Sequence, residues 1–246
     1  MKIDTTEIAA LAQAQADARV DLYGVIHKAL RAMMAETLVA VGRLDGRDAA
    51  ACAHTGEQVR NLLDFCSSHI LHENLWVHTA IEARATGASA RIAQEHGQHE
   101  QHIAALRATL EALLQARSDV PRAVSAARLY RELALFIADN LVHMHAEETT
   151  HNALLWARYS DAELLALHAA LVGSIPPDEM ATTLRWMLPA MNPQERCAML
   201  ADLRDNAPPE AFQGTLDIAQ AHLDGAGWTL LARELGLPPA AGLVTA

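Results

Sequence analysis

Residues 67–84 of the chain read SSHILHENLWVHTAIEAR, a stretch with three histidines and two glutamates but no glycine or proline. Its apolar residues recur at helical spacing, so it predicts a helix whose inward face carries His69 and Glu73. Four residues are just over one helical turn, so these two side chains project side by side. An imidazole and a carboxylate on the core-facing side of a helix need a partner, because burying them without one is costly.

The composition of the chain favours an all-α protein. Of 246 residues, 51% are hydrophobic and 4% aromatic, and Gly and Pro number 12 and 9. This length is ample for a sizeable core, and a chain dominated by Ala and Leu suits helices. The net charge of −11 argues against an extended nucleic-acid-binding surface.

The cysteines and the apolar runs bear on the compartment. Cys52, Cys66 and Cys197 form no CxxC pair, so the sequence predicts neither a disulfide framework nor a zinc ribbon. No apolar run is long enough to span a bilayer, and the first residues lack the apolar core of a signal peptide. We expect a soluble, cytoplasmic protein with no membrane or nucleic-acid partner.

The same periodicity continues on both sides of the opening stretch and predicts four long helices. They are expected at about residues 18–42, 49–84, 90–116 and 122–158. Long amphipathic helices with short connections predict an antiparallel up-down four-helix bundle over 18–158. Beyond it, cap and proline signals predict a C-terminal extension of four short helices over 160–237.

Two copies of the spacing HxxxE have both residues on an apolar helix face. The copies are His69–Glu73 in the second predicted helix and His143–Glu147 in the fourth. The other two helices also turn imidazoles inward, at the positions His27, His96 and His99. A single inward histidine is most often a hydrogen-bonded core residue, but this combination would be very costly to bury without a cation.

Two familiar metal motifs do not fit. A zinc-protease HExxH would need a second histidine where Trp76 stands. A ferritin-like site would need two ExxH copies, and Glu148–His151 is the single match. Mixed imidazole and carboxylate ligands suit iron, manganese or zinc. Four histidines and two glutamates are too many for one catalytic zinc and suit two ions bridged by the carboxylates.

The sequence resembles the hemerythrin-like (HHE-type) family in "VIHKALRAMM", "SSHILHEN", "QEHGQHEQHIAAL" and "LVHMHAEE". The resemblance implies an antiparallel four-helix bundle around two oxygen-bridged iron ions. It further implies bridging roles for Glu73 and Glu147. The terminal ligands it implies are His27, His69, His96 and His143.

The sequence departs from the respiratory hemerythrins, which have HxxxH on the third helix and HxxxxD on the fourth. Here His96 and His99 are three apart, and His99 is either a fifth imidazole ligand or a donor beside the ligands. A missing imidazole implies an open coordination position, which favours reaction with dioxygen, peroxide or nitric oxide in sensing, detoxification or iron handling. A metal-stabilised regulatory module whose C-terminal helices bind a protein partner is the alternative, and a helical scaffold with incidental histidines is a third.

The remaining polar candidates receive lesser roles from their helical positions. His72 and His78 are expected off the inward face, and His145 and His151 are expected to face outward or onto the C-terminal helices. Tyr23 lies one turn before His27 and is expected to be a core residue or a donor to a metal-bound oxygen. Surface positions are expected for His54, His102, His168 and His222.

Overall fold

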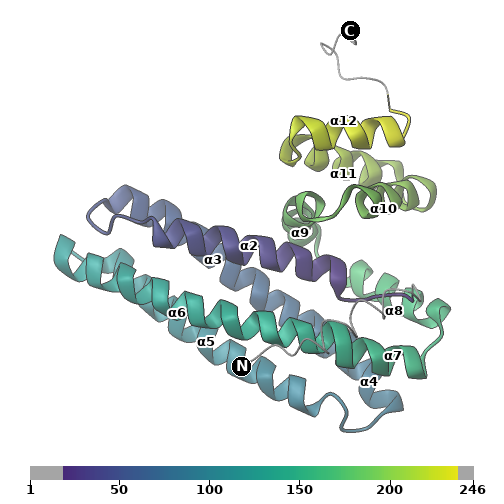
Figure 1. The fold of residues 1–246 in the computed structure, drawn as a ribbon, viewed down its shortest axis with the longest axis horizontal. Coiled ribbons are helices and arrows are strands. Elements are labelled where there is room, and N and C mark those ends of the chain that lie inside the picture. The colour runs from purple at the N-terminus through teal and green to yellow at the C-terminus, as the bar shows by residue number, and fades with distance from the viewer. Residues whose placement is uncertain (1–18, 238–246) are drawn as a thin grey trace, which may run out of the picture. The chain divides into compact units, whose positions relative to one another are not determined.

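The computed structural model describes residues 19–237, which form helices joined by short turns and contain no strand (Figure 1). This confirms the prediction of an all-α protein. None of the described helices is both long and apolar enough to cross a membrane. The elements are α2 (Gly24–Gly42), α3 (Ala49–His72), η1 (Glu73–His78), α4 (Thr79–Arg84), α5 (Ala90–Gln115), α6 (Asp119–Ala146), η2 (Glu147–His151), α7 (Asn152–Arg158), α8 (Asp161–Ser174), α9 (Pro177–Ala190), α10 (Pro193–Asn206), α11 (Pro209–His222) and α12 (Gly225–Glu234).

The described chain divides into two compact units. The first comprises 19–24 and Met34–Ser174, and the second comprises Val25–Met33 and 175–237. Helix α2 is continuous, although its N-terminal half, Val25–Met33, is counted with the second unit. The sequence placed the boundary at 159, whereas α8 is grouped with the helices that precede it.

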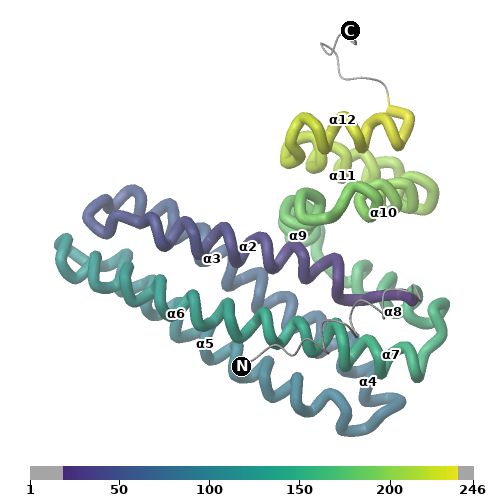
Figure 2. Tube along the Cα trace, in the orientation of Figure 1, coloured from purple at the N-terminus to yellow at the C-terminus, as the bar shows by residue number. Residues whose placement is uncertain are grey.

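Long helical segments build the first unit. The segments α3–η1–α4 and α6–η2–α7 each run without a break, and Figures 1 and 2 show them beside α5, with the chain turning back at each short connection. Their inward faces are aliphatic, as the periodicity predicted. The fully buried side chains include Val59, Leu62, Leu106, Leu110, Leu113, Leu129 and Leu133.

Local hydrogen bonds set where these helices begin. Asp48 is the N-cap of α3, and its carboxylate accepts from the backbone N–H groups of Ala50 and Ala51 at 2.9 and 3.0 Å. Asp21 accepts from the N–H groups of Tyr23 and Gly24 at 2.9 and 3.1 Å. The first helix therefore begins at Gly24 and not at residue 18, which lies outside the described residues.

Two π-helical segments, η1 and η2, interrupt the long helices at the two predicted glutamates. A π turn takes one residue more than an α turn, so the residues that follow it are advanced by one on the inward face. An uninterrupted α-helical period would place Trp76 and Ala80 on that face. The structure buries Val77 and Ile81 instead, each 2% exposed.

Helix α8 covers the end of the first unit where η1, α4 and α7 meet. Leu164 of α8 is fully buried in an apolar cluster with Tyr23, Val77, Ile81 and Leu155. An ion pair joins the chain before α2 to the start of α8, in which Arg19 Nε donates to Asp161 Oδ1 at 2.7 Å. This cluster closes one end of the core in which the polar residues lie.

The second unit contains α9, α10, α11 and α12 around its own aliphatic core. Its buried residues are Leu184, Leu188, Leu200, Leu216, Ala219, Leu231 and Leu235. The prediction of four short helices over 160–237 is wrong, because α8 and these four make five in that range. The segment missed was α12, which begins Gly-Ala-Gly without a proline and is capped by Asp224, whose side chain accepts from the Gly227 N–H at 2.6 Å.

Candidate metal centre

The buried histidines and glutamates form three overlapping groups. Within each group the ligand atoms lie within 4.8 Å of one another. The first group is His27, His69, Glu73 and Glu147. The second group is Glu73, His96, His143 and Glu147. The third group is His78, Glu147 and His151.

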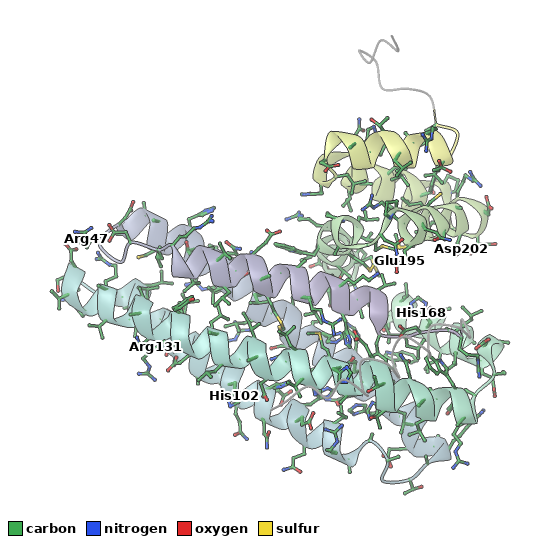
Figure 3. The ribbon with its side chains drawn as sticks, in the orientation of Figure 1. Arg47, His102, Arg131, His168, Glu195 and Asp202 are labelled. Carbon is green, nitrogen blue, oxygen red and sulfur yellow. The ribbon has the colours of Figure 1, made fainter. Side chains whose placement is uncertain are left out.

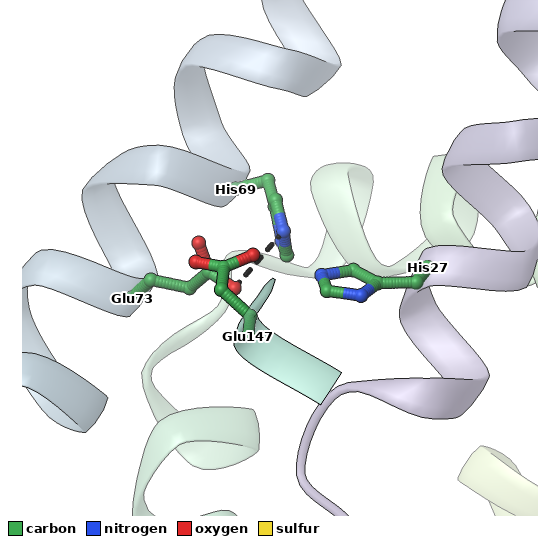
Figure 4. A group of neighbouring side chains, drawn as sticks. All are labelled: His27, His69, Glu73 and Glu147. Carbon is green, nitrogen blue, oxygen red and sulfur yellow. Dashed lines mark ion pairs between the residues drawn. The ribbon is translucent and has the colours of Figure 1, made fainter. Parts of the chain in front are cut away.

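The first group brings residues from three segments of the chain to one point (Figure 4). His69 and Glu73 project from one helix turn, with His69 Nε2 3.1 Å from Glu73 Oε1. Glu147 comes from η2 and His27 from α2, and both are 0% exposed. Figure 4 shows the two imidazoles and the two carboxylates directed toward one another.

The second group is tightly convergent. His96 Nε2 lies 3.0 Å from His143 Nε2, 3.3 Å from Glu73 Oε2 and 3.4 Å from Glu147 Oε1. His143 Nε2 lies 3.2 Å from Glu147 Oε1. Two imidazole nitrogens and two carboxylate oxygens therefore surround one small volume.

The outer nitrogens of the same two rings are held by acceptors. His96 Nδ1 donates to Asn74 Oδ1 at 2.8 Å, and His143 Nδ1 donates to Glu95 Oε2 at 2.9 Å. In this arrangement the Nδ1 atom carries a hydrogen, and the Nε2 atom is directed into the group, where it is available to a cation. Metal-binding histidines typically have such an acceptor on the nitrogen that does not bind the ion.

The two carboxylates of the second group favour a positive charge on the side chains beside them. Burial disfavours a charge on His96, but the hydrogen bonds and charges of Glu147 and Glu73 outweigh burial and raise its pKa to about 9. Burial also disfavours the charged form of His143, and Glu147 again reverses the direction, so the pKa of His143 is raised. In the metal-free protein, protons on these imidazoles stand where a cation would be.

Glu147 remains ionised despite being fully buried. Burial and the charge of Glu73 both favour its neutral form, but the hydrogen bonds from His143 and His96 lower its pKa below the ordinary value. Two like charges held close together in a core are stable only with a compensating positive charge.

His99 is buried on the inward face of α5, as the periodicity predicted, but it belongs to none of the three groups. Its Nε2 contacts Asp139 Oδ2 at 3.1 Å. Burial and the neighbouring His143 lower its pKa to about 4. Its ring packs edge-on against His143, with ring centroids 4.6 Å apart, so it supports the His143 ring.

The expected positions of His78 and His151 were wrong. Both lie inward, 5% and 1% exposed, and with Glu147 they form the third group. An α-helical wheel places His78, five residues after Glu73, away from that glutamate, but the π turn of η1 brings it round to the same side. His151 lies four residues after Glu147, so the longer pattern HxxxExxxH, from His143, could have identified it.

Tyr23 lies 1% exposed beside these groups. Its hydroxyl is 3.1 Å from His151 Nδ1. Burial, together with the charges of Glu73 and Glu147, raises its pKa well above the ordinary value, so the phenol is neutral. It is a core residue, as predicted, and also a hydrogen-bond partner of a histidine in the third group.

The remaining histidines lie outside the three groups. His72 and His145 are half-buried. The four expected at the surface are exposed, and Figure 3 labels two of them, His102 on α5 and His168 on α8. The predicted surface positions of these four residues are therefore confirmed: His54, His102, His168 and His222.

The donors of the first and second groups suit a transition metal. Imidazole and carboxylate together fit iron, manganese or zinc, and no thiolate lies in any group. Searches of protein-family models, of curated proteins and of solved structures found no match for this chain.

Proposed function

We propose that the chain is a hemerythrin-like non-haem di-iron protein, with its long helices arranged as an antiparallel four-helix bundle. Glu73 and Glu147 would bridge two ions. His27 and His69 would complete one position, and His96 and His143 the other. The observation that carries the proposal is that the first and second groups share both carboxylates and differ in their histidines.

Charge and ligand number both support two ions. A carboxylate has two oxygens and can bind a cation with each, so two shared carboxylates can join two neighbouring positions. Each position then has four protein ligands. Iron commonly takes more than four ligands, and the remaining coordination positions are open to a small ligand.

The chemistry we propose is binding of, or reaction with, dioxygen, peroxide or nitric oxide. Bound iron would supply an open coordination position and a change of oxidation state. The protein would hold the ligand atoms in place through Asn74 and Glu95, which fix the rings of His96 and His143. The apolar cluster around Leu155 and Leu164 would help keep bulk water out. Three free cysteines support a reducing, cytoplasmic location.

Spectroscopy and metal analysis of the purified protein test this proposal. Protein expressed with ample iron and purified without oxygen should contain close to two iron ions per chain. Admitting air should produce an oxo-bridged absorption band, and nitric oxide should alter the spectrum of the reduced protein. Less than one metal ion per chain in a folded protein would refute the proposal.

A metal-stabilised regulatory module is the second candidate. The observation that favours it is the second unit, which has its own apolar core and none of the ligand groups within 175–237. Such a module would fold more stably with metal but would not consume peroxide or nitric oxide. Measuring consumption of both by the iron-loaded full chain, against iron-free protein, separates the two functions.

A further inference from the structure

The third group of ligand atoms is used by neither position of the proposed di-iron pair. It consists of one nitrogen each from His78 and His151 and one oxygen of Glu147, all within 4.8 Å of one another. The three residues are 5%, 1% and 0% exposed, respectively.

One nitrogen of each histidine is buried without a hydrogen-bond partner among residues 19–237. These atoms are His78 Nε2 and His151 Nε2. Leaving a buried polar atom unsatisfied costs about 1–3 kcal/mol, and native cores rarely do so. His151 is also fixed from behind, because its Nδ1 lies 3.1 Å from the Tyr23 hydroxyl. Two oriented, unsatisfied nitrogens beside a carboxylate are what a cation site requires.

The geometry separates this position from the second group. A zinc or iron ion holds nitrogen and oxygen ligands at about 2.0–2.2 Å, so opposite ligands of one ion are about 4.4 Å apart at most. Neither His78 nor His151 joins the nitrogens of His96 and His143 within 4.8 Å in any group found among the described residues. The His78 ring instead stacks on the His96 ring, with centroids 4.8 Å apart and planes 6° from parallel. The two imidazoles therefore serve neighbouring positions.

The ligand types of the third group indicate which ion it would bind. Two imidazoles and one carboxylate form the set that binds catalytic zinc and non-haem ferrous iron, with the other positions left to water or a ligand. Glu147 can serve this position as well as the pair, because its two oxygens offer about four lone-pair directions.

We propose that His78, His151 and Glu147 bind a third divalent cation, zinc or ferrous iron, beside the di-metal pair. The inference rests on the proposed function, since Glu147 is shared with that pair. The third cation has one carboxylate, which already faces two cations, so like-charge repulsion makes its affinity lower than that of the pair. This position fills last and empties first.

Zinc binding by the full-length, metal-free protein tests the proposal. The protein is dialysed against a series of buffered free Zn²⁺ concentrations, and zinc per chain is measured by mass spectrometry. We expect a plateau of three ions for the wild type and two for His78→Gln and for His151→Gln. His102→Gln, an exposed histidine on α5, is the control and should keep three.

The outcomes distinguish this proposal from the di-metal function. A wild-type plateau of two, or variants that bind as much zinc as the wild type, would overturn the third site and leave the pair intact. Variants that bind one ion would show that these histidines belong to the pair, which also overturns the third site. A wild type that binds no zinc would overturn the third site, whereas the di-iron function is decided by the iron content of the purified protein. If a variant fails to fold by circular dichroism, anomalous diffraction from zinc-soaked wild-type crystals decides, through a peak between His78 and His151 or none.

Discussion

At the scale of single residues, Glu73 and Glu147 are the two side chains that the first and second ligand groups share. They are 3% and 0% exposed and take part in both four-residue groups. The two histidines that precede them by one turn, His69 and His143, share their helix faces. The repeated HxxxE spacing was visible in the sequence, because i to i+4 neighbours on a helix face the same way whatever the tertiary fold.

Replacing either shared carboxylate should empty both positions. In Glu73→Ala and Glu147→Ala, iron per chain should fall from about two to below one, because each change removes a ligand from both positions and the charge that offsets the cations. His145→Ala, half-buried on α6 outside the groups, should retain the wild-type content. Metal analysis of the folded variants measures this. Equal iron content in all three variants would contradict the bridging roles.

Replacing His96 and replacing His99 should have different effects on the iron content. His96→Ala removes a nitrogen from the second group and should release one iron or abolish the oxo-bridged band. His99→Ala removes a ring that packs on His143 and contacts Asp139, so the site should stay loaded with affinity weakened by roughly 10–100-fold. Iron content and absorption spectra of both variants compare them. If His99→Ala empties the site while His96→Ala stays loaded, the two roles are reversed.

At the scale of elements, η1 and η2 determine which side chains reach the centre. Each begins at a shared glutamate and advances the inward face by one residue. An uninterrupted α-helical period would therefore bury Leu154, whereas the structure buries Leu155. The long helices could be predicted because their apolar period runs over many turns. The π turns could not, since each is one short segment with no compositional signature, and this is why His78 was placed on the wrong side.

The turn between α4 and α5 should make the fold sensitive to acid through Glu82. Its carboxylate accepts from the N–H of Gly87 at 2.6 Å and from the N–H and hydroxyl of Ser89 at 3.0 and 2.7 Å. These hydrogen bonds lower its pKa from 4.5 to about 2. A depressed folded-state pKa means that the stabilisation is complete above about pH 4.5 and is lost as the pH falls toward 2.

Glu82→Gln should therefore unfold at a lower temperature than the wild type at pH 7, and the difference should shrink between pH 4.5 and 3. Thermal melts of the metal-free proteins measure this, because acid-induced loss of metal then does not contribute and titration of the buried histidines and glutamates is common to both proteins. Glu100→Gln, an exposed acid on α5, should match the wild type across the range. If the difference in melting temperature between Glu82→Gln and the wild type stays constant with pH, the charge of Glu82 does not contribute to stability.

At the scale of the whole molecule, the ligand groups lie on helices that are far apart in the sequence. Residues from η1, α5 and η2 meet in the core of the first unit, whereas α9–α12 pack around a separate aliphatic core. The inward faces were predictable from the sequence. Which nitrogens converge was not, because that depends on helix rotation and on partners such as Asn74 and Tyr23, which no spacing rule identifies.

Metal removal should therefore loosen one region and not the other. Without cations, the side chains of η1 and η2 lose the ions that would join them to α5 and α6, so backbone hydrogen exchange should rise there and in the adjoining turns of α5 and α6. Exchange in α9–α12 should change little. Hydrogen exchange with mass spectrometry on metal-loaded and metal-free full chain measures both. A uniform rise along the chain would contradict this separation.

In the proposed centre Glu73 and Glu147 join two ions, and X-ray absorption of the iron-loaded protein measures whether they do. A bridged pair predicts an iron–iron scattering distance of about 3.5–4 Å, or somewhat less with an oxo bridge, together with nitrogen and oxygen neighbours near 2 Å. The Glu147→Ala variant should lose the iron–iron contribution. Two irons per chain in the wild type with no iron–iron scattering would mean that the ions sit apart, and the shared-carboxylate centre would be contradicted.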